Sequence, residues 1–344
     1  MEKIYAQAVE AQEAYNVVED LQSFFVTRLN ELSTTFGDDK AFSPVEWFRD
    51  AGRHGGGVRF VASDDSLFNR GSVNISQVQY DDDDSKSLAS ATALSTIIHP
   101  LNPHVPSIHM HISWTQLKTG EGYWRVMADL NPAIIYDEDT EAFEANLKKQ
   151  AKEHYDEGHE QGERYFYIPA LERHRGVSHF YLEGFNSGDF ESDKCFAISM
   201  GESVIKTYME IVKNALKTRT VISDDDKDQQ LAYHSLYLLQ VLTLDRGTTS
   251  GLLIHDQNDV GVMGSIPRYV DKNLLRAWIV KMKAPQDALL KALVDGITTE
   301  DGLINDEVKA RLAAIVREHY QKNPQALSMQ ASGDIVPDTV DNHK

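Results

Sequence analysis

The sequence predicts an α+β fold in which long α-helices flank one large, mostly antiparallel β-sheet. Strand-like segments follow one another between residues 58 and 129, and helical patterns precede and follow them. No strand–helix–strand rhythm points to a parallel sheet, and no internal repeat or Gly-, Ser- or Pro-rich linker divides the chain. We therefore expect a single domain over residues 1–325. Residues 326–344 lack periodicity and are expected to form a mobile tail.

The composition limits the class of protein. The 344 residues are 41% hydrophobic, enough for a substantial core, and carry a formal net charge of -19. This charge argues against a nucleic-acid partner, because a phosphate backbone needs a basic surface. No apolar run of about eighteen residues and no signal or transit pattern occurs, so we expect no membrane span and a cytoplasmic location. The acidic runs at residues 81–84 and 224–226 predict solvated loops.

The N-terminal region predicts one long helix and then a glycine-rich turn into a strand. Between residues 4 and 33, apolar side chains recur every three or four positions: Val18, Leu21, Phe25, Leu29 and Leu32. Gly55, Gly56 and Gly57 lead into a short strand over residues 58–62. Because no Lys-Ser or Lys-Thr pair and no helix follow them, these glycines match neither a P-loop nor a dinucleotide-binding turn.

The central region predicts strands over residues 72–80, 93–99, 107–115 and 122–129. In the third of them the side chains alternate, with Ile108, Met110, Ile112 and Trp114 on one face and His109, His111 and Ser113 on the other. Its hairpin partner carries Tyr123, Arg125, Met127 and Asp129 on one side. One face of this hairpin is therefore expected in the core, and the other in a polar cleft. Three prolines between His99 and Ser107 exclude a helix there.

The second half of the chain predicts more helix than strand. The helices are expected over residues 138–158 and 193–216, with two or three more between residues 272 and 320. A strand is expected over residues 177–185. Residues 229–237 fit either a helix or a strand, whereas the apolar run at residues 238–246 predicts a strand. Cys195, the only cysteine, excludes an internal disulfide and a zinc–thiolate cluster, and is expected to be a buried structural thiol.

Two charged groups are candidates for a binding site. Asp245 and Arg246 stand where the predicted strand meets a glycine turn, and they form either a strand-end salt bridge or a functional pair. Arg173, His174 and Arg175 form a cationic group in an acidic chain, which is either exposed charge or an anion-binding element.

The histidines of strand 107–115 allow a metal site. His109 and His111 are two residues apart on a strand, so they point the same way and have the geometry of a metal-ligating pair. A third ligand would come from His99, His104 or Asp129. The alternative is a hydrogen-bonded histidine or a general acid or base in the cleft.

Several motifs occur in the order and at the spacing of one enzyme family. They are Gly55-Gly56-Gly57, the segment from Ile98 to His109, Asp129-Leu130-Asn131-Pro132, Arg175-Gly176 and Asp245-Arg246-Gly247-Thr248. In these motifs the chain resembles the oxygen-dependent coproporphyrinogen III oxidases over about residues 20–290. The most specific parts are the proline-rich segment that ends in His109 and the Asp-Arg-Gly-Thr turn.

The resemblance implies a fold, a reaction and a partner. It implies a homodimer in which each sheet lies between layers of helices. The implied reaction is the oxidative decarboxylation of two propionates of coproporphyrinogen III, a tetrapyrrole of haem biosynthesis, to the vinyl groups of protoporphyrinogen IX. Dioxygen is then a co-substrate, and no metal and no organic cofactor takes part.

The resemblance also implies roles for single residues. Asp245 matches the acid that holds the pyrrole N–H groups, for which a carboxylate suits because its oxygens accept several converging bonds. Arg246 and Arg175 are expected to bind propionates. His109 is expected to carry protons. Asp129 matches the acid that opens the family's Asp-Leu-Thr-Pro segment and is expected, with His109 and Asp245, to be catalytic. Ser107, Gly247 and Arg125 complete the expected substrate-binding residues.

The chain departs from the family around these residues. Ser113 stands where the family has an arginine, four residues after the site histidine. Other polar family residues are replaced by Leu236, Leu239, Val241 and Asp271. Arg125 replaces a family glycine one strand away from Ser113 and is expected to supply the missing guanidinium. Arg59 and Arg268 are further candidates for this role.

Three hypotheses follow. The first is an oxygen-dependent coproporphyrinogen III oxidase. The second, motivated by the replaced polar residues, is a relative that binds or modifies another tetrapyrrole. The third is a metal-dependent oxidase or hydrolase built on His109 and His111.

Overall fold

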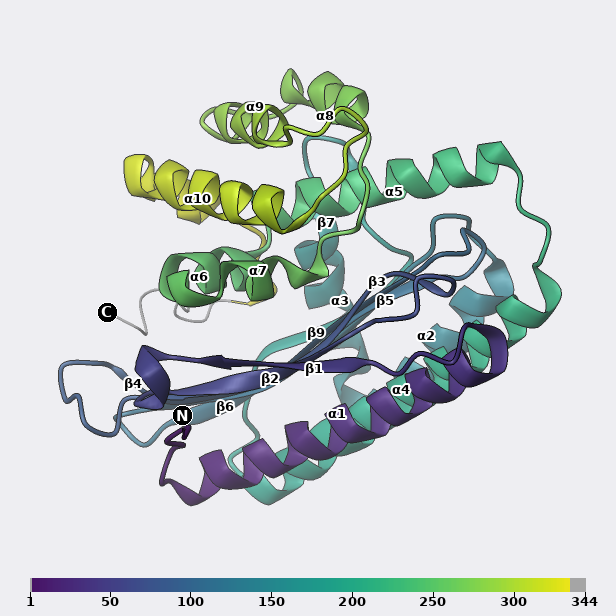
Figure 1. Cartoon of the computed structure of the whole chain (residues 1–344). Helices are drawn as coiled ribbons and strands as arrows, with labels where there is room; N and C mark the ends of the chain where they lie inside the picture. The colour runs from purple at the N-terminus through teal and green to yellow at the C-terminus, as the bar shows by residue number, and fades with distance from the viewer. Residues whose placement is uncertain (1, 335–344) are drawn as a thin grey trace.

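A seven-stranded sheet forms the middle layer of the protein, and helices cover both of its faces (Figure 1). The structure is a computed structural model that describes residues 2–334. The strand order is β1-β2-β3-β4-β5-β6-β9, with every neighbouring pair antiparallel. The strands are β1 (Ser43–Phe48), β2 (Gly55–Val61), β3 (Phe68–Gln79), β4 (Leu88–Pro100), β5 (Ser107–Leu117), β6 (Gly122–Asn131) and β9 (Ser178–Phe185). This architecture confirms the predicted α+β class. A separate hairpin pairs β7 (Tyr167–Ile168) with β8 (Arg173–His174).

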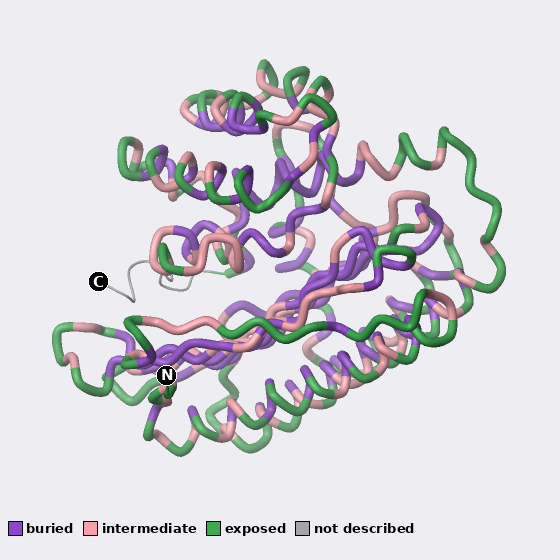
Figure 2. The backbone as a smooth tube through the Cα atoms, viewed as in Figure 1, coloured by how far each residue is buried: buried purple, intermediate pink, exposed green. Residues whose placement is uncertain are grey.

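One face of the sheet packs on a layer of long helices (Figure 1). This layer consists of α1 (Val9–Phe36), α2 (Asp137–Ala151) and α4 (Phe190–Thr218). The apolar stripe predicted for the first helix is buried here, as is the predicted apolar face of β5: Ile108, Met110, Ile112 and Trp114. Apolar side chains on one face of a helix and on alternate residues of a strand thus meet in one core. Figure 2 shows the buried sheet between the more exposed outer surfaces of the helices.

The other face lies under a second, separate helical layer. Its helices are α5 (Asp224–Thr243), α6 (Arg246–Ile254), α7 (Asp259–Val262), α8 (Lys272–Ile279), α9 (Gln286–Gly296) and α10 (Asp306–Lys322). They share a core that receives Ile97 from the central sheet. Helix α3 (Tyr155–Phe166) packs beside β9. Short 3₁₀ turns are η1 (Asp50–Gly52), η2 (Lys152–His154), η3 (Asp256–Asn258), η4 (Met263–Ser265) and η5 (Pro324–Met329). Because these helices bury their apolar residues mostly against one another, the sheet face below them can carry polar side chains.

The strand predicted over residues 238–246 is wrong. This stretch is the end of α5, in which every residue from Tyr233 to Thr243 is buried. A helix that is buried on all sides has no polar face, so its apolar run looks like that of a buried strand. Asp245 and Arg246 therefore lie at the junction between two helices, not at a strand end.

Other local predictions need correction. The edge strand β1 was missed because it is mostly exposed and does not alternate. The helix predicted over residues 138–158 is interrupted after Ala151, where Lys152 has a φ of 49°. The acidic run at residues 224–226 is the first turn of α5, not a loop, and Ser223 and Asp226 form its capping box. Carboxylates favour this position because of the helix dipole. Cys195 is exposed on α4 rather than buried.

The predicted tail falls partly on described residues. Residues 326–334 contact the domain: Ala326 is buried, and the amide of Ala331 donates to the carbonyl of Leu244 at 2.9 Å. Residues 335–344 lie outside the described residues, so the boundary at residue 325 stays a prediction. Within residues 2–334 no helix combines the length and the apolar character needed to cross a membrane.

Candidate active site

A cleft lies between the polar face of the sheet and the second helical layer. It encloses about 1590 Å³, its open mouth included. We call it the central cleft. Its lining includes His109, His111, Ser113 and Arg125 from the sheet, and Asp245, Arg246 and Gly247 from the α5–α6 junction. The structure thus brings together these residues, which lie far apart in the sequence. The alternation of β5 and β6 had predicted the sheet side of this arrangement.

Asp245 is the N-cap of α6 and faces the central cleft. Its Oδ1 accepts a hydrogen bond from the amide of Thr248 at 2.6 Å, and its Oδ2 accepts one from the Tyr165 hydroxyl at 2.9 Å. Burial and the nearby Asp245 raise the pKa of Tyr165 well above its usual value, so the hydroxyl keeps its proton. The carboxylate is therefore held in one orientation, and each oxygen retains capacity for a further donor.

Arg246 lies beside Asp245 and is tied to β9 and to the C-terminal segment. Its Nη1 donates to Oε1 of Glu183 at 3.1 Å and to the hydroxyl of Ser332 at 3.2 Å. Oε2 of Glu183 accepts from the amides of Gly333 and Asp334. Residues 332–334 thus help to position the guanidinium, although the sequence placed them in a tail.

Arg175 is not among the residues that line the central cleft. The prediction that it is an exposed charge is wrong, and its binding of a propionate stays a prediction. Its side chain is fully buried. Nη2 donates to Oδ2 of Asp129 at 2.6 Å and Nη1 donates to Oε1 of Gln240 at 2.7 Å. The guanidinium also lies 4.8 Å from the ring centroids of both Phe166 and Tyr237. Burial alone would lower the pKa of Arg175, but Asp129, Tyr237 and Tyr233 together outweigh it and the pKa is raised. Arg175 is a charged internal support.

His109 connects Arg175 to the central cleft. Nη2 of Arg175 donates to Nδ1 of His109 at 3.1 Å. Because arginine is a donor only, Nδ1 is an acceptor and the imidazole proton lies on Nε2. Burial, assisted by Arg175, lowers the pKa of His109 well below its usual value. The imidazole of the ligand-free protein is therefore neutral, and the hydrogen bond from Arg175 fixes its tautomer.

Arg125 and Ser113 lie directly opposite each other on neighbouring strands. Nη1 of Arg125 donates to the Thr115 hydroxyl and Nη2 donates to the Tyr123 hydroxyl, both at 3.2 Å. None of the carboxylates in residues 2–334 forms an ion pair with this guanidinium. Burial, together with Arg125, lowers the pKa of the nearby His111 to about 4. Arg125 thus brings a positive charge to the strand position next to the serine that replaces the family arginine.

Ser107 and Asp129 also lie beneath the cleft, outside its lining. The Ser107 hydroxyl is buried and is 2.9 Å from Nδ1 of His99, and its contact with substrate stays a prediction. Asp129 is fully buried against Arg175 and therefore cannot reach substrate directly. In the described part of the chain, no group of three or more His, Cys, Asp or Glu side chains is placed to hold a metal ion. The residues proposed as third metal ligands beside His109 and His111 have other partners. His99, for example, also lies 3.2 Å from the Ser265 carbonyl oxygen.

Several residues of the site were not predicted. Glu183 could have been found, because Tyr181 and Glu183 continue the polar face of the sheet on alternate residues of β9. Tyr165 lies on α3 beyond the predicted helix end at residue 158, and no sequence signal pointed to its contact with Asp245. Arg268 is paired with Asp65 at the surface, away from the cleft. Arg59 is buried next to the cleft.

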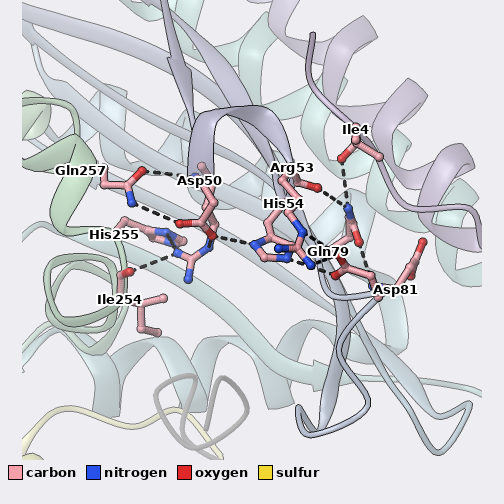
Figure 3. A network of polar contacts seen from close by, with 11 residues as sticks. Ile4, Asp50, Arg53, His54, Gln79, Asp81, Ile254, His255 and Gln257 are labelled. Carbon is pink, nitrogen blue, oxygen red and sulfur yellow. Dashed lines mark hydrogen bonds and ion pairs between the residues drawn. The ribbon is translucent and has the colours of Figure 1, made fainter. Parts of the chain in front are cut away.

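A polar network fastens the rim of the cleft (Figure 3). Nη1 of Arg49 donates to the Ile254 carbonyl at 3.0 Å, and its guanidinium contacts His255, which lines the cleft. Asp50 exchanges two hydrogen bonds with Gln257 and also binds Nδ1 of His54 at 2.6 Å. These contacts join the turn between β1 and β2 to the segment after α6. They hold the second helical layer on the edge of the sheet.

Comparisons with known proteins agree with these features. The family model for Coproporphyrinogen III oxidase matches residues 13–295. The oxygen-dependent coproporphyrinogen-III oxidase of Rickettsia bellii (strain OSU 85-389) is 31% identical over 243 residues, which cover 66% of this chain and 83% of that protein. The enzyme of the same name from Rickettsia akari is 26% identical over 271 residues, 74% of this chain and 95% of that protein. The one from Drosophila melanogaster is 28% identical over 250 residues, 66% of this chain and 63% of that protein.

Proposed function

The chain belongs to the coproporphyrinogen III oxidase family, and on that premise we propose that it catalyses the oxygen-dependent conversion of coproporphyrinogen III to protoporphyrinogen IX in haem biosynthesis. Two propionates become vinyl groups. Each propionic acid loses one carbon dioxide, two protons and two electrons, and one dioxygen accepts the electrons and protons to give hydrogen peroxide. The observation that carries the proposal is the convergence of Asp245, Arg246, His109 and Arg125 on one cleft.

Asp245 is proposed to bind the pyrrole N–H groups. Tyr165 and the Thr248 amide hold its carboxylate from behind, and this orientation supports a task in which converging N–H donors must be met without reorganisation. A carboxylate has the lone pairs for several such bonds. Binding the macrocycle there also places its carboxylate arms toward the walls of the central cleft.

The substrate carboxylates need cations, because a desolvated carboxylate without a partner is costly. Arg246 and Arg125 both line the central cleft and are proposed to bind propionates. Hydrogen bonds to Glu183 and Ser332 hold the guanidinium of Arg246 in position. Two hydroxyl groups do the same for Arg125. Gly247 follows Arg246 and leaves room for the macrocycle beside it.

His109 is proposed to donate a hydrogen bond from Nε2 to a reacting carboxylate or to the dioxygen that reacts with the substrate. Arg175 positions this imidazole through Nδ1, and Asp129 positions Arg175. A neutral imidazole of fixed tautomer can give and take a proton without a net charge change in the resting site. Arg175 and Asp129 are thus positioning residues, not substrate ligands.

Three further properties are part of the proposal. The active form is a homodimer, the protein acts in the cytoplasm, and dioxygen serves as co-substrate without a metal or an organic cofactor. Each rests on the family resemblance and on the sequence properties described above.

Only some of the residues that differ from the family line the central cleft. Leu236 and Leu239 belong to the core of the second helical layer, and Asp271 caps α8. Ser113 and Val241 do line the cleft. Since Arg125 faces Ser113, the lost guanidinium has a neighbouring replacement. This favours retention of the family's substrate over a changed one.

The deciding experiment is turnover by the purified protein. Freshly reduced coproporphyrinogen III is incubated in air, with and without a chelator, and the products are separated by chromatography after oxidation. The proposal expects protoporphyrin in both samples and none without dioxygen. A folded sample that makes no product contradicts the reaction, and activity that the chelator abolishes contradicts a metal-free mechanism.

A further inference from the structure

Arg59 on β2 is a buried guanidinium with no hydrogen-bond partner in residues 2–334. The residue is 7% exposed, and its Nε is buried without an acceptor. No ion pair joins it to a carboxylate within the described chain. A buried guanidinium normally has charged or hydrogen-bonding partners, because its desolvation is otherwise uncompensated. The Arg59 guanidinium is therefore free to bind an anion.

Arg59 adjoins the central cleft through two neighbours. It pairs in register with Asn74 on β3, which lines the cleft and whose Oδ1 is also buried without a partner. Above them lies Gly261, another cleft-lining residue. A Cβ added at Gly261 would lie 2.3 Å from Nη1 of Arg59, so a side chain there would occupy the space of the guanidinium. Arg59 thus lies immediately behind the cleft wall, which Gly261 and the side chain of Asn258 form at this point.

The surroundings of Arg59 have an excess of positive charge. Asp306 is the nearby carboxylate, and it also faces Arg70 and Lys309. Its Oδ1 accepts from Nζ of Lys309 at 2.9 Å. Three cations therefore share Asp306, and of these only Arg70 also faces Asp65, although the chain as a whole carries a net charge of -19. An incoming carboxylate would meet an unsatisfied cation here, whereas Arg175 is already paired with Asp129.

We propose that Arg59 and Asn74 form a carboxylate subsite at the β2–β3 end of the central cleft, where they bind one propionate of the substrate. The carboxylate accepts from the guanidinium, and Asn74 supplies an amide N–H. β3, β4 and β5 lie between Arg59 on β2 and Arg125 on β6. At a spacing of about 4.8 Å between strands, the two arginines anchor opposite ends of a floor roughly 19 Å wide. This inference rests on the proposed function, since it assigns a further arm of the same substrate.

The test compares Arg59→Met and Arg59→Lys with Arg28→Met, which removes an exposed arginine on the far helical layer. For coproporphyrinogen III, we expect KM of Arg59→Met to rise about ten- to a hundredfold with kcat changed less than about threefold, since a charge-assisted bond to a non-reacting carboxylate is lost. Arg59→Lys should recover part of the loss, and Arg28→Met should match the parent protein. A KM for Arg59→Met equal to that of the parent overturns the subsite.

Thermal unfolding without ligand separates binding from a structural role. Removing an unpaired buried cation should leave the Tm of Arg59→Met equal to or above that of the parent. A Tm lowered by more than about 5 °C shows that Arg59 is a structural residue and overturns the subsite.

Binding of coproporphyrin III, the oxidised tetracarboxylate that is not turned over, separates this inference from the proposed function. A parent that binds it more tightly than Arg59→Met but makes no product supports the subsite and refutes the reaction. A parent that turns over and binds no better than Arg59→Met supports the reaction and refutes the subsite.

Discussion

Nη2 of Arg175 donates a hydrogen bond to Nδ1 of His109 over 3.1 Å, directly beneath the central cleft. The same guanidinium holds Asp129 on the neighbouring strand and Gln240 on α5. One buried cation thus sets the tautomer of the cleft histidine and joins the sheet to the second helical layer. The sequence resemblance implies that Arg175 binds a propionate, and the structure places it beneath the cleft as the hydrogen-bond partner of His109.

Removing Arg175 should destabilise the protein strongly. In Arg175→Met, the buried carboxylate of Asp129 loses its arginine and keeps only the His179 imidazole, 3.4 Å from its Oδ1. Breaking a buried pair in this way costs about 3–5 kcal/mol of unfolding free energy. The double variant Asp129→Asn/Arg175→Met should recover part of this loss, because it removes the orphaned charge. Urea unfolding measures both values. A loss below about 1 kcal/mol in the single variant would show that the pair is not the buried ion pair described here.

Buried histidines should weaken the fold in mild acid. Burial lowers the pKa of His111 to about 4, with Arg125 contributing, and lowers that of His234 to about 3. In the unfolded chain both titrate near pH 6.5. Below that pH the unfolded state binds more protons, so stability falls as pH falls, by up to about 1.4 kcal/mol per pH unit for each histidine.

The variant His111→Gln isolates one of these terms. Between roughly pH 6 and pH 4.5, the slope of its unfolding free energy against pH should be smaller by the equivalent of about one proton. Unfolding free energies across this range provide the measurement, and identical slopes for the variant and the parent would contradict it.

His179 acts in the opposite sense. Burial acts to lower its pKa, but Glu163 and Asp129 raise it, so its contribution is present below about pH 6.5 and is lost as pH rises through the raised value.

The register between Ser113 and Arg125 predicts an exchange of roles. Arg125→Gly should lower kcat/KM for coproporphyrinogen III at least about a hundredfold, since a desolvated carboxylate loses its cation. The double variant Ser113→Arg/Arg125→Gly returns a guanidinium to the strand position opposite, where the family carries it. Its kcat/KM should come within about tenfold of the parent. If the second change restores nothing, Arg125 does not replace the lost family arginine.

The sequence predicted best where periodicity and burial agree. The alternation of Ile108 and Met110 with His109 and His111 correctly separated the core face of β5 from its cleft face. Periodicity failed in the C-terminal half of α5, where residues 233–243 are buried on all sides and therefore show no helical period. The burial of Arg175 was also out of reach. An arginine before a strand looks exposed until the fold surrounds it with Asp129, Gln240 and two aromatic rings.

The hydrogen bonds of Asp245 could not be predicted either, because they depend on where α3 docks. Tyr165 reaches Asp245 across 80 positions of sequence. The pairing of Arg246 with Glu183 and Ser332 likewise joins three distant segments. Motif order predicted which residues gather at the cleft, and only the tertiary structure shows which touch it and which support it.

The central claim is that the Asp245 carboxylate anchors the substrate, and Asp245→Asn tests it most directly. Asparagine is also a good N-cap, so α6 and the Tm should be preserved while the anionic acceptor is lost. The measurement is aerobic turnover of coproporphyrinogen III by the parent and the variant. The account predicts that the parent forms protoporphyrinogen IX and that the folded variant loses at least about a hundredfold in kcat/KM. A folded variant with the activity of the parent would contradict it.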